Sequence, residues 1–81
     1  MIVVDSSALV AILEEEPEHR AFKAIIEAAP RRVVSSITVY ETGITLLRRR
    51  GPEGLDDVAA LIEAFDFEIV ALGSIPLPKR A

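Results

Sequence analysis

The sequence predicts an α/β domain built on a three-stranded parallel sheet. Three short runs rich in β-branched residues alternate with two longer stretches that have helical periodicity. Each longer stretch can carry the chain from one strand to a parallel neighbour, so the order β-α-α-β-α-α-β implies right-handed crossovers. A chain of 81 residues is enough for one small domain of this kind.

The first strand is predicted at residues 1–4, a continuous apolar run that is typical of a strand buried on both faces. Residues 5–7, Asp-Ser-Ser, end this strand and belong to the residue types that cap helices. A short helix follows over residues 8–13. It has to end before Pro17, because proline disfavours helical backbone in the residue that precedes it.

A second helix is predicted at residues 18–29, where apolar side chains recur on one helical face until Pro30 ends the pattern. This face comprises Phe22, Ile25, Ile26 and Ala29. Residues 33–35 then form the second strand, which is short and again rich in valine.

The third helix is predicted at residues 36–50, with Gly51 as its C-cap. Its last turn holds three arginines, residues 48–50, which suit the negative end of the helix dipole. We expect them to lie in solvent, with contact to phosphates as an alternative. Pro52 opens a fourth helix, and residues 67–72 form the third strand.

Residues 1–72 are therefore interpreted as the folded part and residues 73–81 as an extended, mobile, proline-rich tail. Pro76 and Pro78 exclude a helix or a central strand in this tail. Three strands make a thin sheet for an α/β fold. We expect another copy of the chain to cover the open edge or face, which gives a homo-oligomer.

Composition excludes several classes of protein. A hydrophobic fraction of 51% excludes a disordered chain, and the absence of cysteine excludes disulfides and thiolate metal sites. The net charge of −4 opposes non-specific binding to nucleic acid, so such contact needs a metal ion or a local basic patch. The sequence has no apolar segment long enough to span a membrane, and we take a cytoplasmic location as the default.

Two carboxylates are predicted near the carboxyl edge of the sheet, where open α/β sheets bind ligands. Asp5 follows the first strand, and Glu41 follows the second by about one and a half helical turns. Oxygen donors in this position suit Mg²⁺ or Mn²⁺. Each residue also has a simpler structural interpretation, Asp5 as a helix N-cap and Glu41 as the partner of Thr38 in a capping box.

Three segments, taken in order, resemble the PIN-domain ribonucleases of the VapC type, the toxins of bacterial and archaeal toxin–antitoxin pairs. The segments are Ile-Val-Val-Asp-Ser-Ser-Ala-Leu-Val-Ala-Ile-Leu at 2–13, Glu-Glu-Pro-Glu at 15–18, and Val-Val-Ser-Ser-Ile-Thr-Val-Tyr-Glu-Thr-Gly at 33–43. The resemblance covers roughly residues 1–72.

The resemblance implies a metal-dependent endoribonuclease, in which acidic residues hold Mg²⁺ or Mn²⁺ and the metal activates a water that cleaves RNA. It implies Asp5 and Glu41 as metal ligands and Ser7 as the residue that orients a metal-bound water. It also implies two partners, an RNA substrate and a protein antitoxin.

The sequence departs from the family pattern after residue 72, where family members continue with two further aspartates and two further strands. We therefore expect a C-terminally truncated toxin with weak or no nuclease activity. The alternative is a non-catalytic half-domain that binds an antitoxin or pairs with a full-length toxin, and a product with no retained role is a third interpretation. The candidate helix faces for such a partner carry Phe22, Ile25 and Ile26, or Leu55, Val58 and Ile62. We favour ordinary packing in the core as the role of these faces.

Overall fold

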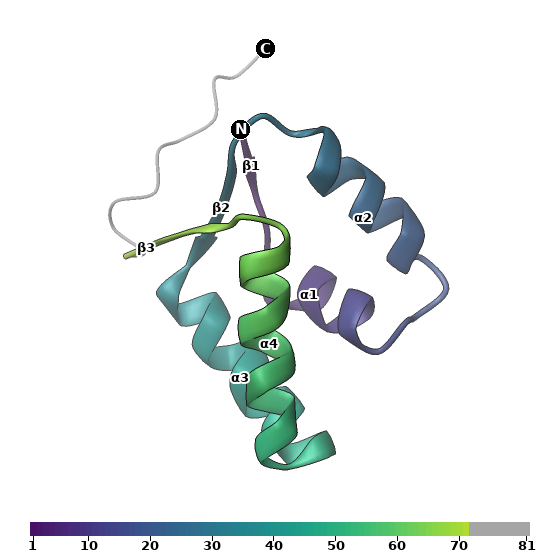
Figure 1. Cartoon of the computed structure of the whole chain (residues 1–81), viewed down its shortest axis with the longest axis vertical. Helices are drawn as coiled ribbons and strands as arrows, with labels where there is room; N and C mark the ends of the chain where they lie inside the picture. The colour runs from purple at the N-terminus through teal and green to yellow at the C-terminus, as the bar shows by residue number, and fades with distance from the viewer. Residues whose placement is uncertain (72–81) are drawn as a thin grey trace.

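The computed structural model describes residues 1–71, which form a parallel sheet with helices packed against it (Figure 1). The elements are β1 (Ile2–Val3), α1 (Ser6–Leu13), α2 (His19–Ala28), β2 (Arg32–Ser35), α3 (Ser36–Arg50), α4 (Pro52–Ala64) and β3 (Glu68–Val70). The predicted fold class and the order β-α-α-β-α-α-β are confirmed. The predicted tail, residues 73–81, and the last residue predicted for the third strand, Leu72, lie outside the described residues.

The sheet has the order β1-β2-β3, so β2 is its central strand. Both neighbours pair with β2 in parallel, and Val33 lies level with Val3 on one side and Glu68 on the other. Val33 and Val34 are fully buried. Because all strands of the described chain run in one direction, their carboxyl ends meet at one edge of the sheet.

The outer strands are more exposed than the sequence predicts. Val4 is buried at the end of β1, but Met1 and Val3 each retain 39% of their accessible surface. The expectation that this strand is buried on both faces is therefore wrong, because β1 pairs with β2 alone within residues 1–71. Ile69 of β3 is 51% exposed for the same reason.

The hydrophobic core lies between the sheet and the helices. Its buried members are Val4, Leu9, Ile12, Ile26, Val34, Leu46, Val58, Leu61, Ile62 and Phe67. α3 and α4 lie side by side as a helical hairpin (Figure 1). Gly51 joins them with φ 71°, and its N–H donates to the carbonyl of Leu47 at 2.8 Å, which confirms the predicted C-cap.

Arg32, the first residue of β2, ties two helix ends to the sheet. Its guanidinium donates to the carbonyls of Phe65 and Glu27, both at 2.8 Å, and of Ala29 at 3.4 Å. These carbonyls lie at the C-terminal ends of α4 and α2, where the last turn has no intrahelical donors left. A positive charge is also favoured there by the helix dipoles.

Replacing Arg32 by Met is expected to lower the free energy of unfolding by about 2–3 kcal/mol, because charge-assisted hydrogen bonds to carbonyls at two helix ends are lost, those to Phe65 and Ala29 being partly buried. Arg31→Met is the matched control. Arg31 forms an exposed ion pair with Glu68 at 2.9 Å, a type of contact that adds little stability in water. Urea denaturation of both variants tests this, and equal loss in the two would contradict the assigned role of Arg32.

Gly54 of α4 is predicted to resist substitution, because an added Cβ would come within 2.3 Å of the Leu46 carbonyl oxygen in α3. Gly54→Ala should lower the melting temperature, although alanine stabilises most helix interiors by about 1 kcal/mol over glycine. Gly43→Ala is the control, since its Cβ would meet the flexible end of Leu55 at 3.3 Å. A melting temperature that rises in Gly54→Ala would show that the helices separate at little cost.

Candidate functional site

Asp5 lies two residues after the end of β1 and is the N-cap of α1. Its Oδ1 accepts the backbone N–H of Ala8 at 3.1 Å and the hydroxyl of Ser7 at 2.8 Å. The structural interpretation of Asp5 as a helix cap is therefore confirmed. Both Asp5 and Ser7 remain exposed at the carboxyl edge of the sheet, so capping does not remove the carboxylate from solvent.

The same hydrogen bonds set the charge of Asp5. The Ser7 hydroxyl, followed by the Ala8 N–H, holds the pKa of the Asp5 carboxyl below its usual range, and partial burial opposes this only in part. The carboxylate is therefore ionised at neutral pH. An ionised carboxylate is the form that binds a divalent cation.

Glu41 does not belong to a capping box. The N-cap of α3 is Ser35, whose hydroxyl accepts the N–H of Thr38 and donates to the Thr38 hydroxyl, both at 2.9 Å. Thr38 therefore already lies inside the helix, and the predicted pairing of Thr38 with Glu41 is wrong. Glu41 is exposed on the second turn of α3, and its backbone carbonyl accepts from Thr45.

The topology brings Asp5 and Glu41 toward the same edge of the sheet. Val3 of β1 pairs with Val33 of β2. Asp5 and Ser35 each lie two residues beyond this pair, so they are level at the end of the sheet. Glu41 lies six residues after Ser35, about 9 Å along the axis of α3. The structure thus joins Asp5 to Ser7 by a hydrogen bond and places Glu41 about 1.7 helical turns from the strand end.

Within residues 1–71 no group of three or more His, Cys, Asp or Glu side chains could hold a metal ion. The sequence named the carboxylates of Asp5 and Glu41 as donors; Asp5 and Ser7 line a common groove, and Glu41 is not among the residues that line it. Mg²⁺ usually binds proteins through one or two carboxylates and keeps several waters. This donor set therefore fits a weakly held hydrated cation and does not fit a closed cage of protein ligands.

The arginines at the end of α3 are partly committed to ion pairs. Arg50 donates to Asp57 at 2.8 Å and to the Leu13 carbonyl at 2.6 Å, and it joins α1, α3 and α4. Arg49 and Arg50 also lie 3.5 and 3.4 Å from Glu14. The three arginines are exposed, as the sequence predicts. Arg49 and Arg50 in addition form ion pairs, which make them less available to phosphates.

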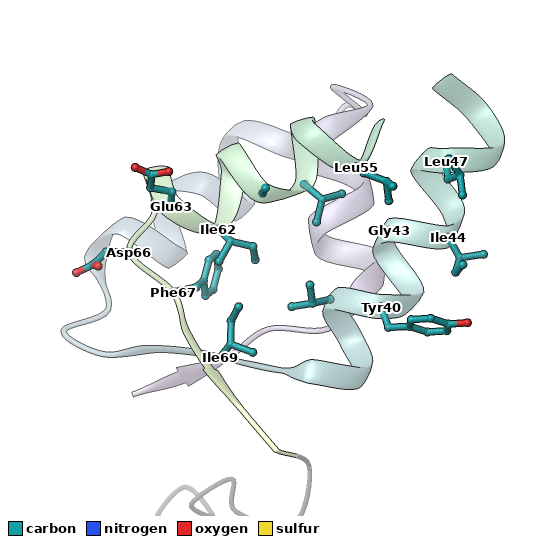
Figure 2. Close-up of a pocket in the computed structure, with 13 residues that line it drawn as sticks. Tyr40, Gly43, Ile44, Leu47, Leu55, Ile62, Glu63, Asp66, Phe67 and Ile69 are labelled. Carbon is teal, nitrogen blue, oxygen red and sulfur yellow. The ribbon is translucent and has the colours of Figure 1, made fainter. Parts of the chain in front are cut away.

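Two apolar grooves flank the domain. One, of about 300 Å³, lies beside Asp5 and Ser7 and is lined by the face of α2 that carries Phe22, Ile25 and Ile26. The other, of about 700 Å³, lies between α3, α4 and β3 and includes Leu55, Val58 and Ile62 (Figure 2). Both helix faces named from the sequence therefore line grooves, although Val58, Ile62 and Ile26 are themselves buried in the core.

A match to a family model decides the family. The model of the PIN domain matches residues 2–78. The chain belongs to the PIN-domain family. The resemblance stated from the sequence is confirmed, and the three-stranded sheet with Asp5 after its first strand is the part of this PIN domain that the structure describes.

Similar proteins carry VapC names. This PIN domain is 32% identical over 71 residues to "Ribonuclease VapC30" of Mycobacterium tuberculosis and to "VapC ribonuclease Mb0640" of Mycobacterium bovis. These alignments cover 88% of this chain and 54% of each relative. It is also 38% identical over 53 residues to "Ribonuclease VapC" of Mycolicibacterium smegmatis. That alignment covers 65% of this chain and 41% of the relative. The chain thus spans about half the length of these curated relatives.

Replacing Ser7 by Ala in this PIN domain should raise the pKa of Asp5 toward its usual value, because the strongest hydrogen bond to the carboxylate is removed. A carboxyl ¹³C titration by NMR measures the change, with Ser6→Ala as the control. The lowered pKa stabilises the fold above the pKa of the unfolded chain, and this contribution is lost as the pH falls through the folded value. In Ser7→Ala the free energy of unfolding should therefore fall less steeply as the pH is lowered. An unchanged Asp5 titration would show that the Ser7 hydroxyl does not lower the pKa of Asp5.

Proposed function

We propose that this chain is the N-terminal part of a VapC-type PIN endoribonuclease that depends on Mg²⁺ or Mn²⁺. The observation that carries the proposal is the ionised, exposed Asp5 carboxylate at the carboxyl end of β1, in a chain that belongs to the PIN family. Asp5 and Glu41 are the proposed metal ligands. The proposed substrate is RNA.

In this proposal the residues of the chain prepare the site before any substrate binds. The Ser7 hydroxyl and the Ala8 N–H both donate to Oδ1 of Asp5, and the remaining lone pairs of this carboxylate would hold a divalent cation. Ser7 fixes the carboxylate through its proton and keeps acceptor lone pairs that orient a water. Glu41 approaches from α3, directly or through a water. A bound Mg²⁺ or Mn²⁺ would supply an activated water and positive charge beside the phosphate.

The activity proposed for this chain is weak or absent. RNA phosphates and a protein of net charge −4 repel each other, so a cation has to be held at the site for the two to approach. Two carboxylates hold such a cation poorly. The chain spans about half the length of its relatives, and we infer that the residues needed for a stronger site correspond to the part of the relatives that this chain does not match.

The alternative function is a non-catalytic half-domain that binds a protein antitoxin or pairs with a full-length toxin. Ile25 supports it, because this side chain lines the groove beside Asp5 and is 56% exposed. A homo-oligomer would cover the same surface. We propose a cytoplasmic location for either function. Within residues 1–71, no helix is long and apolar enough to cross a membrane.

Calorimetric titration with Mn²⁺ tests the metal site. We expect weak binding by the unchanged protein and at least tenfold weaker binding by Asp5→Asn, which removes the charge but keeps a side chain that caps helices equally well. Asp5→Ala should lose the binding and also about 1 kcal/mol of stability, because it lacks a cap.

Asp66→Asn is the matched control, since it removes the same charge from an exposed position before β3. Equal Mn²⁺ affinity in the unchanged protein and in Asp5→Asn would exclude Asp5 as a ligand. Slow RNA cleavage with Mn²⁺ that disappears in Asp5→Asn would support the enzyme. Metal binding without cleavage would favour the half-domain.

A further inference from the structure

α3 exposes a stripe of apolar side chains on a face that its packing in the core does not use. The helix contributes Thr42 and Leu46 to the interior, and both are fully buried. Four apolar residues lie along another side of the helix and remain exposed or partly exposed: Ile37, Tyr40, Ile44 and Leu47. Figure 2 shows the last three in a row along α3. A contiguous apolar stripe of this kind is typical of an interaction surface.

The spacing of this stripe is that of a coiled-coil seam. Its members follow one another at intervals of three, four and three residues, which is the a-d-a-d pattern of a heptad repeat. A helix with this pattern buries its seam against a second helix. α4 packs on the Leu46 side of α3, where Gly54 lies against Leu46, and it leaves Tyr40 69% exposed. The seam is therefore available to a helix from outside residues 1–71.

Two opposite charges flank the stripe. Glu41 and Arg48 follow Ile37 and Ile44 by four residues, so each occupies an e position of the heptad. Both side chains are exposed, and neither forms an ion pair within residues 1–71. They lie about 10 Å apart along the axis of α3. Charges at e positions set the orientation of helices that pair through a seam.

A second copy of the chain supplies the charges that complement Glu41 and Arg48. A two-fold axis makes any contact between two different residues occur twice, once in each direction. Glu41 can meet Arg48 of the other copy in this way if the two α3 helices run antiparallel, because Glu41 lies nearer the start of the helix and Arg48 nearer its end. In a parallel pair, each of these residues would instead lie level with its own copy, and like charges would repel.

We propose that two copies of this chain associate through antiparallel α3 helices. Ile44 of each copy packs against Leu47 of the other, and Glu41 of each pairs with Arg48 of the other. This association requires neither a metal nor RNA, so it is independent of the proposed function. It also places a guanidinium beside Glu41, and a carboxylate with two oxygens can accept that contact and still approach a cation.

Sedimentation velocity of the full chain tests the proposal. We expect a mass near twice 8.8 kDa at micromolar concentration without added metal. Leu47→Glu should weaken the association at least tenfold, because it places a charge in the seam. Ile25→Glu is the matched control, since it puts the same charge on another exposed apolar position, in α2, and it should associate like the unchanged protein. Circular dichroism shows whether both variants keep their helices.

A charge reversal tests the antiparallel register with exposed side chains, so it decides the question even if Leu47→Glu does not fold. Arg48→Glu should weaken the association about tenfold, because two glutamates then face each other across the seam. Adding Glu41→Arg to the same chain should restore the association to within threefold of the unchanged protein. Arg20→Glu reverses an exposed charge on α2 and should change little.

Four results would overturn the proposal. The first is any mass other than that of two chains. The second is a folded Leu47→Glu variant that associates like the unchanged protein. The third is a loss of association in Ile25→Glu, because the interface would then lie at the groove beside Asp5. The fourth is a double variant that Glu41→Arg does not restore, because Glu41 and Arg48 would then not meet across the two copies.

Discussion

Within residues 1–71, β2 forms hydrogen bonds with a strand on each side, because β1 and β3 both pair with it. Its two valines are fully buried, and its two ends are used to position helices. At the start of the strand, Arg32 closes the last turns of α2 and α4 through their carbonyls. At its end, Ser35 caps α3. A strand of four residues thus fixes three helices, and a change in its register would displace all of them at once.

The candidate site follows from the same parallel arrangement. Parallel pairing places the ends of β1 and β2 at one edge, so the N-caps of α1 and α3 both lie there, with Asp5 exposed and Ser35 buried. One set of contacts supports both the helix and the proposed metal site, since the Ala8 N–H that Asp5 caps and the Ser7 hydroxyl also keep the Asp5 carboxylate charged. Such shared support is how folds hold functional groups in place without separate elements.

Local patterns predicted the elements well and their environments less well. The N-cap role of Asp5 could be assigned because the contacts that define it lie within three residues, whereas the hydrogen bond from Ser7 to Asp5 was not predicted. The capping box at Thr38 failed because Ser35 matches the same cap pattern, and the length of β2, which the sequence near Thr38 does not specify, decides between them. The role of Arg32 could not be predicted, since its acceptors come from two different helix ends. The exposure of Val3 and of Ile69 in β3 likewise depends on whether another strand lies beside them.

The order of the strands in the sheet is also their order along the chain, so each strand pairs with the one that precedes it. During synthesis, β1 and the hairpin of α1 and α2 emerge before β2, and β2 needs no later residue to complete its pairing with β1. β3 then adds to a ladder that already exists. Domains are made from the N-terminus at about 5–20 residues per second, which is slow compared with helix formation and loop closure. The sheet can therefore grow strand by strand on the ribosome, and its assembly follows the direction of translation.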